Sequence, residues 1–169
     1  KARQNPELAN ILRSAKFVGA DGVPIVWASK LLRDPLPGRI NGTDLMDRLI
    51  ERSAEKGHRI FFLGAKQEVI ETAVNDLKIK YPTLQIAGYR NGYFNSEETE
   101  KDVVNQINAS NENILLVGMS TPMKEFWVRK YHNDLNVNVI HGVGGSFDIL
   151  GGITKRAPVW MQKTGLEWF

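Results

Sequence analysis

Four short, mainly apolar segments recur along the chain, and each is closely followed by a glycine and then by residues with helical spacing. Apolar runs that do not alternate with polar residues are typical of strands buried on both faces of a parallel sheet. Strands that alternate with helices predict a Rossmann-like, doubly wound α/β fold with a mostly parallel sheet and helices on both faces. The predicted strands are residues 59–63, 84–87, 114–117 and 137–140.

The glycines after these strands indicate where a ligand would bind. In open α/β sheets, ligands bind outside the carboxyl ends of the strands. A single glycine there is explained by the turn alone, whereas four together indicate a pocket. The four glycines are Gly64, Gly88, Gly118 and Gly142.

The stretch GVGGSFD, residues 142–148, lacks the dinucleotide fingerprint because Phe147 stands where the third glycine would be. Two interpretations stay open. Its backbone amides suit an anion and its carboxylate suits ribose hydroxyls, or the stretch is a strand-to-helix turn capped by Ser146. The candidate nucleotide-binding residues here are Gly142, Gly144, Gly145, Ser146 and Asp148. In the GGITKRAP that follows, Lys155 and Arg156 face either a phosphate or the membrane.

Residues 20–49 combine a D-G turn, an apolar helix and a proline-flanked loop. Asp21 alone is best explained as a turn former, and Trp27 and Leu31 belong to an apolar helix face. Arg39 is either a solvated loop charge or a bidentate grip on a diphosphate. The next helix is predicted to be capped near Thr43.

Later helix starts are marked in the same way. Ser96 precedes acidic residues and is predicted to cap the helix after the second strand. Pro122 is predicted at the first position of the helix after the third strand.

Composition excludes several classes of function. The 169 residues are 42% hydrophobic, which suits one domain over residues 1–169 with a substantial core. A net charge of +3 is far from the dense basic face of a nucleic-acid binder, so no nucleic-acid partner is expected. No apolar run is long enough to cross a membrane, and there is no cysteine, so a cytoplasmic protein is expected. The chain starts near a helix and stops on aromatic residues, so we expect the natural protein to extend past both ends.

Metal-dependent chemistry has no motif in this sequence. The histidines, His58, His132 and His141, are far apart, and neither H-E-x-x-H nor D-x-D occurs. We therefore expect no metal and no cofactor. A bound diphosphate would have to be neutralised by Arg, Lys and helix N-termini.

Seven segments occur in a characteristic order: ADGVPIVWASKLL, PLPGRINGTDL, FFLGA, GYF, GMSTPMKEFW, GVGGSFDILGGITKRAP and QKTGLEWF. Together they resemble the WecG/TagA/CpsF family of bacterial glycosyltransferases over nearly the whole chain. The resemblance implies an inverting, metal-independent transfer of N-acetylmannosamine from a UDP-sugar donor to a lipid-diphosphate-linked sugar acceptor. It is closest to the branch whose acceptor is N-acetylglucosaminyl-diphospho-undecaprenol, at the start of the wall teichoic acid linkage unit.

Other functions stay open beside this one. The donor sugar could instead be N-acetylmannosaminuronic acid or glucose, for enterobacterial antigen or exopolysaccharide, or the chain could be a non-catalytic nucleotide-binding module. The resemblance also implies a peripheral position at the inner face of the cell membrane, with membrane contact through a C-terminal extension that this chain lacks. Apolar surface left uncovered without it would favour a homo-oligomer.

The resemblance assigns roles to single residues. Asp21 would be the general base that takes the acceptor proton, and Arg39 would stabilise the departing diphosphate. Tyr93 suits stacking near the nucleotide base and Asp148 suits the ribose. Lys124 replaces a glutamine found in many relatives, so it either holds a phosphate more strongly or changes which sugar fits. The remaining members of the implied nucleotide-sugar site are Gly64, Gly118, Glu125, Gly142, Gly144, Gly145 and Ser146.

Overall fold

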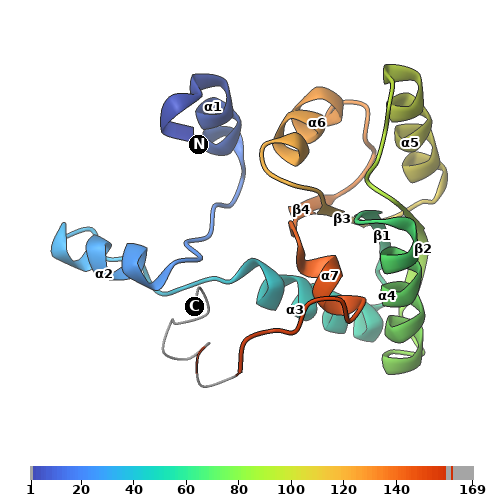
Figure 1. Cartoon of the computed structure of the whole chain (residues 1–169), viewed down its shortest axis with the longest axis horizontal. Coiled ribbons are helices and arrows are strands. Elements are labelled where there is room, and N and C mark those ends of the chain that lie inside the picture. Colours follow the sequence, from blue (N-terminus) through green and yellow to red (C-terminus); the bar gives the residue numbers. More distant parts are fainter. Residues whose placement is uncertain (1, 159–160, 162–169) are drawn as a thin grey trace.

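A computed structural model describes residues 2–158 and 161, and it is an α/β fold built on one four-stranded sheet (Figure 1). All neighbouring strands are parallel, in the order β2-β1-β3-β4. The predicted fold class is confirmed. The strands are β1 (Arg59–Gly64), β2 (Gln85–Arg90), β3 (Ile114–Gly118) and β4 (Val139–Gly142).

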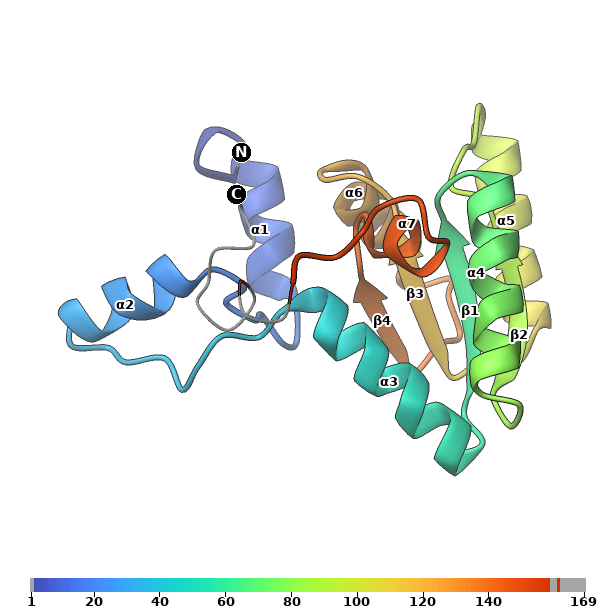
Figure 2. The ribbon, with the colours of Figure 1, turned by 60° about the horizontal axis from the view of Figure 1, so that its bottom comes forward.

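Helices cover both faces of the sheet (Figure 2). Helices α3, α4 and α7 pack on one face, and α5 and α6 pack on the other. Helices α1 and α2 precede this layered part in the chain, and a 3-10 turn, Ala2–Gln4, precedes α1. The helices are α1 (Pro6–Ser14), α2 (Val23–Leu31), α3 (Gly42–Lys56), α4 (Gln67–Lys80), α5 (Glu97–Ala109), α6 (Met123–Tyr131) and α7 (Ser146–Leu150).

The sequence of strand β1 is apolar without interruption because the strand is buried on both faces of the sheet. Successive side chains of a strand point to opposite faces of the sheet. Ile60 and Phe62 accordingly belong to the core beneath α3 and α4, while Phe61 and Leu63 belong to the core beneath α5 and α6. Both faces of β1 are buried, as the apolar run predicts.

Strand β2 differs from its prediction. The strand was expected to end at Ala87, with Gly88 in the turn, but it continues to Arg90. The pairing with β1 skips Ala87, since Ile60 pairs with Ile86 and Phe61 pairs with Gly88. A Cβ at Gly88 would lie 2.6 Å from the Phe61 ring, so this glycine makes room for an aromatic side chain within the sheet.

The predicted helix starts were right to within a few residues. Ser96 caps α5 through a reciprocal capping box with Thr99, which confirms that prediction. Asn41, rather than Thr43, caps α3, since its side-chain oxygen accepts from the amides of Thr43 and Asp44. Pro122 is the N-cap of α6 and not its first helical residue.

Helix α2 forms where its pattern predicts, but it buries none of its side chains. The two residues expected on an apolar face, Trp27 and Leu31, are 64% and 85% exposed. Figures 1 and 2 both show α2 at one end of the molecule, away from the sheet. Across residues 2–158 and 161, no helix has both the length and the apolar character that a membrane crossing needs.

Helices α5 and α6 are joined by an ionic cluster. Lys130 Nζ and Tyr131 Oη both donate to Glu100 Oε2, each over 2.8 Å. Burial raises the pKa of the Glu100 carboxyl, but the two hydrogen bonds outweigh it and hold the pKa below its usual 4.5. The charged form of Glu100 is therefore favoured in the folded protein.

This cluster predicts a pH-dependent contribution to stability. A carboxyl whose pKa is lowered by folding stabilises the protein above its unfolded pKa, and this contribution is lost as the pH falls through the folded value. We expect Glu100→Gln to lower the free energy of unfolding by about 1 kcal/mol at pH 7 and by much less at pH 3. Urea unfolding of both proteins at the two pH values measures this. An equal difference at both would contradict it.

A candidate nucleotide-sugar site at the carboxyl edge of the sheet

A cavity of about 530 Å³ lies where the parallel strands end. Its wall takes residues from the turns after β1, β2 and β3, and from the segment between β4 and α7. This is the edge at which open α/β sheets bind ligands, and the volume falls in the range of small-molecule sites. Of the predicted site residues, it is lined by Tyr93, Gly118, Gly144, Gly145 and Asp148.

Two glycines at strand ends, Gly64 and Gly118, allow β1, β3 and α7 to pack closely at this edge of the sheet. Gly64 has a φ of 144°, and a Cβ there would lie 2.3 Å from the carbonyl oxygen of Gly118. A Cβ at Gly118 would in turn lie 2.3 Å from the ring of Phe147. These glycines are therefore required by the packing of β1, β3 and α7 against one another.

The turn after β4 differs from the interpretation in which Ser146 caps the helix that follows. Gly144 has a φ of 56°, and Gly145 is the N-cap of α7. Ser146 is the first residue of α7, and its hydroxyl donates to the carbonyl of Val143 over 2.7 Å. The alternative in which Ser146 caps the helix is wrong, because Gly145 is the N-cap and the Ser146 side chain bonds back to Val143 in the turn. Asp148 does lie in the first turn, facing the cavity.

Several lining residues were missed by sequence reasoning. Lys66 is the N-cap of α4, and together with Asp148 it supplies the charged side chains among the described residues that line the cavity. Met119 and Met123 add apolar wall beside Tyr93. The signal for Lys66 was its position two residues after the strand-end glycine of FFLGAK, where a helix N-terminus was already predicted.

Gly92 takes the place that was expected for Gly88. It lines the cavity after β2, and a Cβ there would lie 2.9 Å from Met119 and 3.0 Å from the Cα of Gly64. The GYF motif, Gly92–Phe94, thus has its glycine in the packed turn and Tyr93 largely exposed at the cavity.

Lys124 and Glu125 directly follow the cavity-lining Met123, do not line the cavity themselves, and are bonded to each other. Lys124 Nζ lies 2.5 Å from Glu125 Oε1, and both side chains bond to the Thr121 hydroxyl. The Lys124 side chain also packs against Gly142, where a Cβ would lie 2.9 Å from its Cε. Glu125 Oε2 is buried without a hydrogen-bond partner among the described residues. A buried carboxylate oxygen in that condition is a ready acceptor for a ligand hydroxyl.

Asp21 and Arg39 are brought together, but outside the cavity wall. Arg39 Nε donates to the Asp21 carbonyl over 2.7 Å and lies 3.5 Å from its carboxylate. The same carboxylate oxygen accepts from Asn41 Nδ2 over 2.9 Å. The Asp21 side chain is still 62% exposed, so these two contacts leave it largely accessible.

The start of α3 connects this pair to the cavity edge. Asn41, which bonds Asp21, is the cap of α3, and the neighbouring Thr43 hydroxyl lies 2.8 Å from the Ser146 hydroxyl. His141 Nε2 donates to the Gly42 carbonyl over 3.1 Å. Through these contacts, the segment that holds Asp21 is tied to β4 and to Ser146, whose neighbours Gly145 and Phe147 line the cavity.

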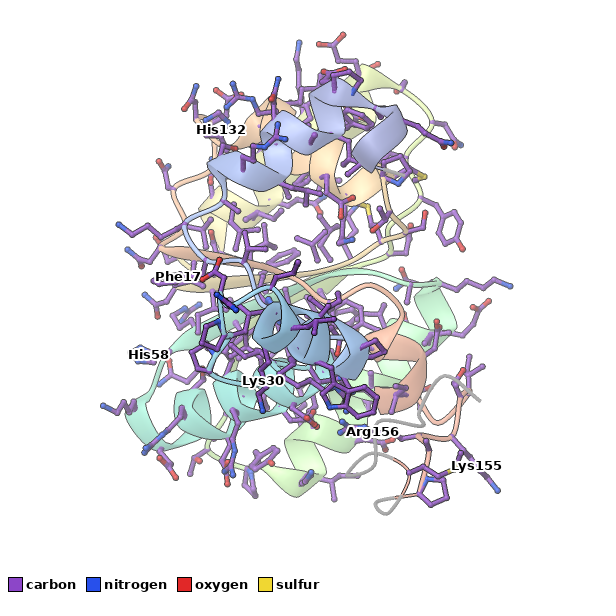
Figure 3. All side chains as sticks on the ribbon, turned by 90° about the vertical axis from the view of Figure 1, so that its left-hand side faces the viewer. Phe17, Lys30, His58, His132, Lys155 and Arg156 are labelled. Atoms are coloured by element: carbon purple, nitrogen blue, oxygen red, sulfur yellow. The ribbon has the colours of Figure 1, made fainter. Side chains whose placement is uncertain are left out.

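The segment after α7 folds back onto α3. Arg156 bonds the Asp44 carboxylate and lies 3.7 Å from Asp47 Oδ2, while Lys155 extends outward from the protein (Figure 3). Burial raises the pKa of the Asp47 carboxyl, and the charge of Arg156 opposes that rise. Arg156 therefore has a carboxylate partner on α3. Within the described part of the chain, no three His, Asp or Glu side chains lie close enough together to hold a metal ion.

Comparison with known proteins gives a family for this arrangement. The model of the "Glycosyl transferase WecG/TagA/CpsF family" matches residues 1–169. A protein of Bacillus spizizenii is 38% identical over 168 residues, which cover 99% of this chain and 64% of that protein. Similar proteins of Bacillus subtilis and Staphylococcus aureus are 35% and 34% identical, and 67% of each is covered.

All three relatives carry the name N-acetylglucosaminyldiphosphoundecaprenol N-acetyl-beta-D-mannosaminyltransferase. The chain spans about two thirds of their length.

Proposed function

Because the chain belongs to the glycosyl transferase WecG/TagA/CpsF family, we propose that it transfers N-acetylmannosamine from UDP-N-acetylmannosamine to N-acetylglucosaminyl-diphospho-undecaprenol. The transfer inverts the anomeric carbon and takes place at the inner face of the cell membrane. The names of the relatives support this choice of donor sugar and acceptor over the alternatives weighed from the sequence.

The observation that carries this proposal is the cavity at the carboxyl edge of the sheet. Its volume of about 530 Å³ suits a nucleotide, and its wall combines aromatic and apolar surface with charged side chains. Tyr93, Met119 and Met123 provide surface on which a base can stack. Asp148 provides a carboxylate for ribose hydroxyls.

The diphosphate of the donor is assigned to Lys66. This residue lines the cavity at the N-terminus of α4, where the helix dipole and backbone amides favour an anion. The Lys66 side chain therefore adds a full positive charge to the partial positive charge at the N-terminus of α4. It takes the phosphate-binding role that was one of the two alternatives for Lys124.

Lys66 gives a direct test of donor binding. We expect Lys66→Ala to raise the Kd for UDP about tenfold, since a charge-assisted hydrogen bond to phosphate contributes about 1.5–3 kcal/mol. Isothermal titration calorimetry measures the change. Lys78→Ala, on the exposed last turn of the same helix, is the matched control and should leave the Kd unchanged. Equal effects of the two substitutions would contradict the assignment.

The acceptor side is assigned to Asp21. Its exposed carboxylate takes the proton of the acceptor hydroxyl while that oxygen attacks the anomeric carbon of the donor sugar. The bond from the anomeric carbon to the phosphate oxygen breaks, and UDP leaves with the electron pair. Arg39 and Asn41 hold Asp21 in place, and release of Arg39 towards the diphosphate would neutralise the charge that develops there.

The donor sugar is assigned to the region of Glu125. The unpartnered oxygen of this buried carboxylate suits a sugar hydroxyl or amide, and Lys124 fixes the other oxygen. In this arrangement Lys124 acts through Glu125 and not as a separate phosphate ligand. The presence of Lys124 in place of the glutamine found in many relatives would then affect which sugar fits.

The test is the release of UDP from UDP-N-acetylmannosamine in the presence of N-acetylglucosaminyl-diphospho-undecaprenol. UDP-N-acetylmannosaminuronic acid and UDP-glucose serve as competing donors. We expect UDP release to depend on the acceptor and to be fastest with UDP-N-acetylmannosamine. Faster release with either competitor would overturn the choice of sugar, and binding of UDP without any transfer would support a non-catalytic module.

A further inference from the structure

Helix α2 and its flanks form an apolar surface that the described chain does not cover. The helix contains two polar residues, Ser29 and Lys30, and buries no side chain. Leu31 is 85% exposed, and Phe17, before the helix, is 88% exposed. Figure 3 looks onto this side of the molecule, with α2 towards the viewer and Phe17 and Lys30 labelled. We call Phe17, Val18, Ile25, Trp27, Leu31 and Leu32 the α2 surface.

The distribution of apolar residues on α2 differs from that of a helix that docks into a groove. A groove-binding helix shows one apolar stripe and a polar opposite face, whereas a helix that is apolar on all sides belongs in an apolar environment. The hydroxyl of Ser29 is satisfied internally, since it donates to the Val26 carbonyl and accepts from the Leu36 amide. The helix can therefore leave water without losing a hydrogen bond at Ser29.

The length of α2 determines how it could meet a bilayer. Nine residues give a helix of roughly 13 Å, far short of the roughly 30 Å that a membrane crossing needs. The helix therefore does not cross the bilayer, and its tryptophan suits the interface, where such rings lie at the level of the headgroups. Trp27 is 64% exposed and free to take that place.

The charges around α2 suit an anionic surface. Residues 13–34 carry four cations, Arg13, Lys16, Lys30 and Arg33, against two carboxylates, Asp21 and Asp34. One of those carboxylates, Asp21, is already paired with Arg39. Exposed cations that flank an apolar helix are attracted to anionic lipids and repelled by a like-charged protein surface, such as the same face of a second copy.

From these observations we propose that the α2 surface docks into the interface of an anionic lipid bilayer. Docking would anchor the molecule to the bilayer through α2 and its flanks, with Trp27 at the level of the headgroups. One consequence rests on the proposed function: Asp21 lies two residues before α2, so docking brings the assigned base to the headgroup level, where the diphosphate of a lipid-linked acceptor lies.

The experiment is cosedimentation of the whole chain with vesicles of phosphatidylglycerol and phosphatidylcholine in equal amounts, without donor or acceptor. We expect the double substitution Trp27→Glu and Leu31→Glu to lower the partition coefficient at least about tenfold, since two exposed apolar side chains no longer insert. Ile79→Glu is the matched control, because Ile79 is 79% exposed on α4, away from the α2 surface. This control should bind vesicles as the parent chain does.

A second pair of variants tests the charge. Lys30→Gln with Arg33→Gln should weaken binding to the mixed vesicles but change little on phosphatidylcholine alone. Calorimetric binding of UDP, measured on every variant, reports separately on the fold and on the donor site. Loss of vesicle binding with UDP binding intact supports docking even if no transfer activity is found.

Two results would overturn the proposal. In the first, the parent chain does not sediment with anionic vesicles, or the α2 double variant binds them as well as the parent. In the second, the double variant converts an oligomer to a monomer in sedimentation equilibrium while vesicle binding is unchanged. That second result would assign the α2 surface to contact between copies of this chain.

Discussion

Asp21→Asn should lower the rate of sugar transfer by about 10²–10⁴-fold while UDP still binds with its normal affinity. Asparagine keeps the size of the side chain but has no carboxylate to take the acceptor proton. The Asp21 side chain is largely exposed and lies outside the cavity that we assign to the donor, so its loss should not affect UDP. The rate is measured as UDP release with saturating donor and lipid-linked acceptor.

The control for this substitution is Asp34→Asn, which removes a carboxylate from the exposed loop after α2. We expect this variant to retain full activity. If Asp21→Asn also transferred sugar at the parent rate, the base would have to be another residue. If it lost UDP binding together with transfer, Asp21 would belong to the donor site.

Gly64→Ala should destabilise the fold by about 3 kcal/mol, through backbone strain and steric overlap together. The φ of 144° at this position is rarely adopted by residues with a side chain, and the added methyl would meet the backbone of Gly118 at 2.3 Å. Because the obstacle is backbone at the centre of the sheet, no side chain can rotate to relieve it. The part of the cavity wall at Gly118 would be displaced together with this backbone.

Urea unfolding measures this effect, and Gly38→Ala is its control. Gly38 has no atom within 4 Å of the added methyl, and its φ lies outside the left-handed region, so its substitution should change stability by less than about 0.5 kcal/mol. A similarly small change for Gly64→Ala would show that the approach of β1 to β3 is looser than described. UDP affinity should fall for Gly64→Ala and stay unchanged for Gly38→Ala.

The apolar runs determined the sheet well because they are local. Strand β1 and strand β3 were found to within one residue, since burial on both faces demands a continuous apolar run. Strand β2 was placed less well. Its extension to Arg90 depends on a bulge at Ala87 and on space for Phe61 beneath Gly88, and neither is visible from the spacing of β2 itself.

The position of the site could be predicted, but not its full membership. Strand-end glycines located the cavity because the carboxyl ends of parallel strands meet at one edge. Met119 was missed because a methionine after a strand has no distinctive sequence pattern, and Lys66 was missed although it stands where a helix N-terminus was predicted. The bonds that join Asp21 to Arg39 and Asn41 span 18 and 20 residues, and only the fold brings these residues together.

Exposure was the property that the sequence predicted least. An apolar helix such as α2 reads as part of a core, since periodicity shows that side chains are apolar but not whether anything covers them. Its exposure in the structure is what points to an external apolar environment.

The most direct test of the donor site is a crystal structure of the chain with UDP. The expected density has its diphosphate at Lys66 and the N-terminus of α4, its uracil beside Tyr93, and its ribose within reach of Asp148. Density for UDP at Asp21 and Arg39 with the cavity empty would contradict the assignment of the cavity to the nucleotide.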